Sequence, residues 1–220
     1  EWFMSKSELF SVGAFYKEIN NPINQVVAFD ATGTQRYFRT GDQARIIGFE
    51  AEIRKNILVD DNDETLLSGG LNFTYMHTEQ DLYNSISGTY SVSFRNDKEE
   101  LQGASPIIIN ADLNYSPTFG EYKPTANLVF SYFSDRIDAL GSGQLGNVIE
   151  KGLPTFDFIL KNKVTSHLDI NLAVKNILNP TVQYIRETKQ GNILVTSPNG
   201  KDVSDYKKGM QIGLELKYKF

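Results

Sequence analysis

The sequence predicts an all-β protein that crosses a membrane as an antiparallel, up-and-down β-barrel. Three observations predict it: eight segments in which apolar and polar residues alternate, connections that are long and short in turn, and the lack of any run of about 18 apolar residues. A membrane-spanning strand needs only about 9 to 11 residues with every second one apolar, so the mean hydropathy of −0.34 agrees with a barrel.

The predicted strands follow one another along the whole chain. They are residues 7–19, 44–55, 66–76, 107–115, 125–133, 155–161, 168–175 and 210–220. A soluble sandwich could bury the same alternating residues. Two features favour the membrane: the strand interiors carry charged and amide side chains on the face opposite the apolar one, and aromatic residues end the apolar faces, at Tyr75, Tyr115, Tyr132 and Tyr218.

The connections predict which end of each strand faces outward. Those after the first, third, fifth and seventh strands are long, and those after the second, fourth and sixth are short. Bacterial membrane barrels have short periplasmic turns and longer outer loops. The last strand therefore runs inward, which places Tyr218 and Phe220 at the periplasmic interface, where aromatic rings are favoured.

Composition argues against several classes of function. The net charge of −5 and the absence of a basic cluster disfavour nucleic acid as a partner. With no cysteine there is no disulfide, no thiolate metal site and no cysteine nucleophile. The two histidines, His77 and His167, belong to opposite ends of the predicted barrel, which argues against a histidine-dependent hydrolase. We expect no enzyme activity and no cofactor.

Four short motifs have simpler explanations than a functional site. GSGQLG (141–146) lies in a long connection and not in a βαβ unit, so it predicts a flexible outer loop. DDNDE (60–64) lacks the calcium-loop spacing and predicts a solvated turn. Glu50 and Glu52 belong to a polar lining, and Asn72-Phe73-Thr74 lies inside a strand. We therefore name no catalytic, cofactor-binding or metal-binding residue.

Five segments together resemble the C-terminal barrel of TonB-dependent outer-membrane receptors, particularly the Bacteroidetes-type, SusC-like receptors that often carry a carboxypeptidase-regulatory-like domain. They are ELFSVGAFYKEINNPI (8–23), GFEAEIRKNI (48–57), LQGASPIIINADLNY (101–115), LDINLAVKNILNP (168–180) and GLELKYKF (213–220). The resemblance implies that residues 1–220 supply about eight C-terminal strands of a barrel of about 22 strands. It also implies that the plug domain and TonB box lie elsewhere in a longer protein.

The resemblance further implies a location, partners and an activity. The location is the bacterial outer membrane, and the partners are its lipid, the barrel-assembly machinery, the TonB complex, and a surface lipoprotein or larger membrane assembly. Phe220, with Tyr218, matches the family's assembly signal. The activity is energy-coupled uptake of a chelate, glycan or peptide. The alternative is a free-standing eight-stranded barrel with a structural or adhesion role, which the inward glycines Gly48, Gly70 and Gly213 disfavour because a small closed lumen must be filled by side chains.

The sequence leaves the substrate site open. Aromatic and arginine residues on or near the long connections are candidates for substrate contact: Tyr37, Phe38, Arg39, Tyr83, Tyr90, Arg136, Tyr184 and Arg186.

Overall fold

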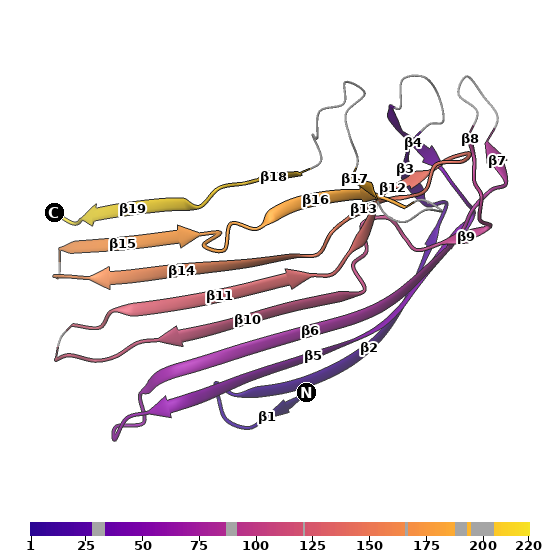
Figure 1. The fold of residues 1–220 in the computed structure, drawn as a ribbon. Helices are drawn as coiled ribbons and strands as arrows, with labels where there is room; N and C mark the ends of the chain where they lie inside the picture. Colours follow the sequence, from indigo (N-terminus) through magenta and orange to yellow (C-terminus); the bar gives the residue numbers. More distant parts are fainter. Residues whose placement is uncertain (28–33, 87–91, 121, 166, 188–192, 195–204) are drawn as a thin grey trace.

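The main element of the protein is a ten-stranded antiparallel sheet (Figure 1). The computed structural model describes residues 1–27, 34–86, 92–120, 122–165, 167–187, 193–194 and 205–220. In the sheet, neighbours pair in the order β1-β2-β5-β6-β10-β11-β14-β15-β19, and β9 pairs with the end of β6. Their bounds are β1 Trp2–Phe3, β2 Leu9–Asn20, β5 Gln43–Val59, β6 Thr65–Asp81, β9 Lys98–Glu99, β10 Ile107–Tyr115, β11 Thr125–Phe133, β14 Leu153–Lys163, β15 Leu168–Lys175 and β19 Gln211–Tyr218.

All eight predicted strands are confirmed, in an up-and-down order. β10, β11 and β15 have the predicted bounds, whereas β5 and β6 extend well beyond them. These two strands stay paired from Ala44–Gln80 to Val59–Thr65, past the segment in which apolar residues alternate. Short turns join the strands at one end of the sheet, and the long connections gather at the other (Figure 1). No helix in the described residues is long and apolar enough to cross a membrane.

Register separates the sheet into an apolar face and a polar face. Residues paired across successive strands form rows, and the side chains of successive rows point to opposite faces of the sheet. One apolar row is Phe10, Ile53, Leu71, Ala111, Phe130 and Phe156. The next row toward the long connections, on the other side, is Ser11, Glu52, Asn72, Asn110, Ser131 and Thr155. Many large apolar side chains, such as Val12 at 58% exposure and Leu214 at 67%, are uncovered on the apolar face.

Two diagonals of polar and aromatic residues border the apolar face. Near the short turns the border consists of Lys55, Tyr115, Asn162 and Tyr218; each lies two strands further along the sheet, and two residues nearer the short-turn end, than the one before. Near the long connections the same step relates Tyr16, Tyr75 and Tyr132.

The diagonals define how far the strands tilt. A shift of one residue per strand, with a rise of about 3.3 Å per residue and a spacing of about 4.8 Å between strands, corresponds to a tilt of about 35°. Each step of one residue along a strand, or of one strand across the sheet, then changes the height along the barrel axis by about 2.7 Å. Along this axis the two borders are about 19 Å apart. With this tilt the apolar band runs parallel to the membrane plane, and the tilt agrees with the roughly 35–45° of strands in membrane barrels.

The long connections build a second structure, which we call the outer cap. It contains a seven-stranded sheet in the order β17-β16-β13-β12-β3-β4, with β18 paired to β16, and a separate β7-β8 pair. The bounds are β3 Ile23–Val27, β4 Gln35–Arg39, β7 Ser85–Ile86, β8 Val92–Ser93, β12 Arg136–Gly141, β13 Val148–Glu150, β16 Thr181–Arg186, β17 Ile193–Leu194 and β18 Asp205–Lys207.

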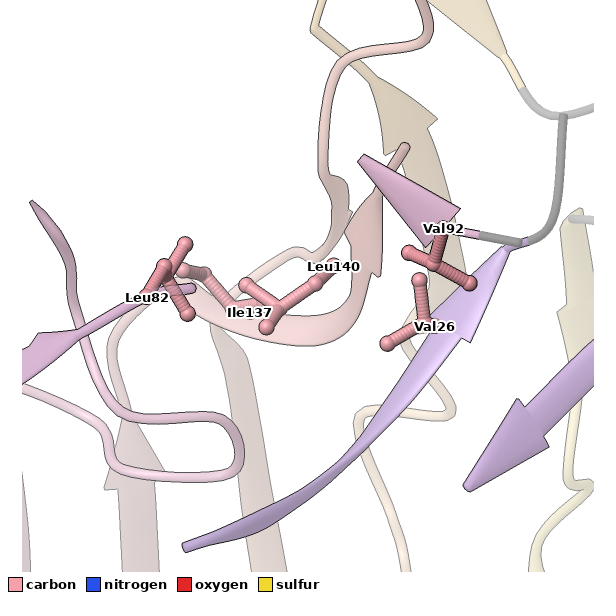
Figure 2. Close-up of a cluster of buried hydrophobic side chains, with 5 residues drawn as sticks. All are labelled: Val26, Leu82, Val92, Ile137 and Leu140. Atoms are coloured by element: carbon pink, nitrogen blue, oxygen red, sulfur yellow. The ribbon is translucent and has the colours of Figure 1, made fainter. Parts of the chain in front are cut away.

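The buried core lies mostly in the outer cap and not in the large sheet. Val26, Leu82, Val92, Ile137 and Leu140 form one cluster (Figure 2). Val27, Ala139 and Val148 form a second. Burying apolar side chains from separate connections is what holds these short strands together. The long connections therefore pack against one another.

The inward glycines were expected to leave open space, and at two positions this is wrong. A Cβ on Gly48 would lie 2.5 Å from the Phe15 ring, and one on Gly70 would lie 2.5 Å from Asp112 Oδ1. Neighbouring side chains fill these places. A Cβ on Gly213 would meet nothing within 4 Å, so only there is the expected space present.

Candidate ligand-facing surface of the outer cap

Two candidates for substrate contact, Arg136 and Tyr184, lie in one row with a glutamate, and the three residues come from separate cap strands. β13 pairs with β12 and β16, which aligns Arg136, Glu150 and Tyr184. The Nε and Nη2 atoms of Arg136 lie 2.8 and 2.7 Å from Glu150 Oε2. The same guanidinium lies 4.4 Å from the centroid of the Phe133 ring, at the end of β11. The pair is thus fixed against the end of the large sheet, with two guanidinium nitrogens engaged by one carboxylate oxygen.

The row sits in a partly dehydrated, acidic environment. Burial raises the pKa of the Asp138 carboxyl, Glu150 raises it further, and Arg136 lowers it. Burial raises the pKa of Tyr184 to about 12, with contributions from Glu150, Asp138 and a hydrogen bond with Tyr206. Tyr184 therefore stays protonated and can donate or accept a hydrogen bond at neutral pH.

A cavity of about 180 Å³ is lined by Arg136 of this row but by neither Glu150 nor Tyr184. Its lining combines charged and apolar side chains: Glu100, Asp135, Arg136, Ile137, Ile149 and Glu187, with Ile185. Asp135 accepts a hydrogen bond from Gly152 N at 2.7 Å and pairs with Lys151. Burial raises the pKa of the Glu187 carboxyl, as do Glu99 and Glu100, while Arg95 lowers it. The cavity could accept a polar group that donates hydrogen bonds.

A second group of candidates forms a separate, more exposed cluster. Tyr83 donates a hydrogen bond to Asp42 Oδ1 at 2.7 Å, and Arg39 Nη2 lies 2.6 Å from the same oxygen. The Arg39 guanidinium lies 5.7 Å from the Tyr83 ring centroid. The hydrogen bonds to Tyr83 and Arg39 hold the pKa of Asp42 below its ordinary value. These three side chains contact one another at the cap surface.

The other candidates differ in role. Tyr37 is 72% exposed, whereas Phe38 packs against the buried cluster. Arg186 donates to the carbonyl of Gly146 at 3.3 Å, and burial lowers its pKa. Tyr90 lies outside the described residues. The structure thus brings together Arg136 and Tyr184, and separately Arg39 and Tyr83.

The GSGQLG segment is a packed turn, so the prediction of a flexible loop is wrong. Ser142 is buried and its hydroxyl donates to the carbonyl of Val27 at 2.7 Å. A Cβ on Gly146 would lie 1.9 Å from the Glu187 carbonyl oxygen, and Gly143 has a φ of +62°. The glycines are needed because backbone segments approach closely here.

The remaining acidic and histidine positions agree with their structural explanations. Asp60 Oδ1 accepts hydrogen bonds from the backbone of Asn62 and Glu64, at 2.9 and 2.8 Å, which closes the β5–β6 turn. Glu52 pairs with Arg54 at 2.6 Å on the polar face. His77 lies toward the long connections on β6 and His167 in a short turn. Among the described residues, no cluster of three or more histidines and carboxylates is placed to hold a metal ion.

Sequence reasoning missed the buried polar residues that tie the cap to the large sheet. Gln80, fully buried at the end of β6, accepts a hydrogen bond from Asn24 Nδ2 at 2.7 Å and donates to the Glu100 carbonyl at 2.8 Å. Gln102 accepts from Gln25 N at 2.7 Å and donates to the Asp138 carbonyl. In a polar connection, an amide side chain gives no sign of which distant strand it will contact.

The apolar band, the aromatic borders and the short and long connections define the wall of an outer-membrane type of β-barrel. The family model for "TonB dependent receptor-like, beta-barrel" matches residues 1–177. No curated protein and no solved structure matches the chain. The chain belongs to the TonB-dependent receptor β-barrel family, whose members are receptors and transporters of the outer membrane. In barrels of this type the apolar face contacts lipid, the polar face lines the lumen and the short turns are periplasmic.

Proposed function

We propose that this chain forms the C-terminal strands of the barrel wall in an importer that takes up a nutrient with energy supplied through TonB. The observation that carries the proposal is the open pairing order: in the described part of the chain β19 pairs with β15 alone and β2 pairs with β1 and β5, so the two edges of the sheet do not meet there. Each edge strand offers unpaired backbone groups, which the hydrocarbon does not tolerate. Further strands of a larger barrel would satisfy them.

The alternative of a free-standing eight-stranded barrel requires β19 to pair with the β1–β2 edge. The open order weighs against that closure, as does the empty space above Gly213. The larger barrel would enclose a plug domain, which transmits the pull of the TonB complex, and Phe220 would serve as the signal for barrel assembly.

The proposed capture surface is the row of Arg136, Glu150 and Tyr184 with its adjoining cavity. It offers a planar cation, a paired carboxylate and a protonated phenol, which together suit a polar ligand with several hydrogen-bonding groups. Glycans, peptides and chelates all have such groups, and the nutrient class is left for experiment.

Two measurements test the proposal. The intact mass of the outer-membrane polypeptide that carries this sequence should exceed 24.8 kDa several-fold; a mature chain of that mass would reject the large barrel. Uptake of labelled glycans, peptides and chelates should then be compared in a deletion strain complemented with the native gene, R136Q or a K123Q control, which breaks an ion pair with Glu64 among the short turns. Uptake that survives collapse of the proton-motive force would reject energy coupling.

If capture occurs at this row, R136Q should raise the half-saturating nutrient concentration about 10- to 150-fold, because it breaks contacts worth about 1.5–3 kcal/mol. K123Q should behave as the native protein. Equal uptake by both variants would show that the capture surface lies elsewhere in the receptor.

A further inference from the structure

The lipid-facing side of the sheet is not smooth, because it carries a groove. The groove has a volume of about 420 Å³ and crosses β5, β6, β10, β11 and β14. Its floor is made by two small residues on neighbouring strands, Gly69 and Ala111, and apolar side chains such as Ile57, Leu113 and Phe156 form its walls. A Cβ on Gly69 would lie 3.1 Å from Leu113 Cδ2 and 3.2 Å from Ile57 Cδ1, so a larger residue would fill the groove.

An ion pair lies at one end of this groove. Lys55, which lines the groove, places its Nζ 2.9 Å from Glu8 Oε1. The backbone N–H of Asn56 donates to the same oxygen at 3.1 Å. The Lys55 side chain is 53% exposed and that of Glu8 is 12% exposed, so the ammonium is still accessible. Lys55 shares the lipid-facing parity of Ile53 on β5, and Glu8 lies immediately before β2.

The position of the pair in the membrane follows from the diagonal border. Lys55 begins the periplasmic border, so the charges lie at the level of lipid headgroups, where a charge costs about 0–1 kcal/mol and not the 2–4 kcal/mol of the midplane. The pair has no net charge, and it presents a cation and an anion side by side.

The groove rises from this pair across the apolar band. From Lys55 to Phe156 the path crosses four strands and moves two residues toward the long connections. With the tilt of about 35° this is a rise of about 16 Å, most of the roughly 19 Å between the two borders. The sideways displacement is about 12 Å, so the groove follows a leaning acyl chain.

We propose that this groove is a binding site for one zwitterionic phospholipid of the periplasmic leaflet. An acyl chain lies over Gly69 and Ala111, the lipid phosphate contacts the Lys55 ammonium, and the headgroup ammonium contacts the Glu8 carboxylate. The pairing of a cation with an anion favours a phosphoethanolamine headgroup over a purely anionic one, which would meet Glu8 with like charge.

Lipid retention tests the site without measuring nutrient uptake. The full receptor, reconstituted in vesicles of equal phosphatidylethanolamine and phosphatidylglycerol, is extracted in mild detergent and weighed by native mass spectrometry. The native protein should keep one phosphatidylethanolamine in preference to phosphatidylglycerol. G69L, which fills the groove, and K55Q, which removes the cation, should each lower its retention about threefold.

Matched controls lie outside the groove. V12L adds bulk to another lipid-facing position, and K123Q breaks an ion pair of 2.9 Å with Glu64 among the short turns; neither should change retention. Heat-modifiable mobility on gels shows whether each variant is folded, and A111F replaces G69L if G69L is not. Equal retention of both lipids by the native protein, preference for phosphatidylglycerol, or an equal loss in the controls would overturn the proposal.

Discussion

The tilt of the apolar band predicts that residues in distant rows lie at the same membrane depth. Val12 on β2 and Leu214 on β19 are three apolar rows apart, which is about 20 Å along the strands. The diagonal borders nevertheless place Val12 about 8 Å inside the periplasmic border and Leu214 about 8 Å inside the outer one. Ile212, two residues from Leu214, should lie only about 3 Å inside the outer border.

Spin labels can measure these depths, because the chain contains no native cysteine and each single-cysteine variant is labelled at one place in it. V12C, I212C and L214C all replace side chains that are more than half exposed, so a nitroxide fits without repacking. Collision with oxygen and with a water-soluble nickel chelate reports the depth of each label in vesicles. We expect similar depths for V12C and L214C, and a depth about 5 Å shallower for I212C.

A difference of more than about 5 Å between V12C and L214C would refute the reasoning, since a difference of that size exceeds one full step between lipid-facing residues of a strand tilted by about 35°. It would mean that the two aromatic borders are not the edges of the hydrocarbon. An I212C label as deep as L214C would refute the outer border in the same way.

Four further predictions concern the outer cap and the end of the chain. L140A should destabilise the cap by about 2–5 kcal/mol through the cavity it leaves, measured by hydrogen exchange of β12, whereas L214A should not, because that side chain faces lipid. Q80A should cost about 1–3 kcal/mol by removing one partner of Asn24 and a partner of the Glu100 carbonyl, visible as faster exchange in β3 and absent from the exposed control Q211A. Because the folded-state pKa of Asp138 is raised, the folded cap loses stability as pH rises through the carboxylate range; D138N should therefore raise the melting temperature at pH 7 and have no effect below about pH 3.5, where the carboxyl is protonated in both states. F220A should slow barrel assembly in cells, followed by heat-modifiable mobility, with little loss of stability once assembled, because the Phe220 ring is exposed and meets the Tyr218 ring edge-on.

The large sheet could be predicted because its information is local. Each strand repeats its own alternation, as in β10 and β11, and the length of each connection indicates the end at which it lies. Even the borders are visible as the tyrosines that end the apolar faces. Their diagonal arrangement is not visible, because it depends on the register between strands, which no single strand specifies.

The outer cap could not be predicted because its strands depend on distant pairing. β12 pairs in parallel with β3, which places Leu140 beside Val26 although the two residues are far apart in the sequence. β13 has only three residues. Such strands are too short to show a period, and polar residues such as Asn24 look like those of any solvated loop. Arg136 and Tyr184 were recognised as candidates by residue type, but Glu150, which joins them, was not.

The interleaving of β3, β12 and β16 in one sheet sets the order in which the receptor can mature. These strands come from three different connections, and β13, which lies between β12 and β16, lacks one neighbour until β16 has arrived. The cap is therefore completed only after β15 and the connection beyond it have reached the outer surface. A barrel that stalls before that point would leave Val148 of the second cluster without Tyr184, the β16 side chain that packs against it.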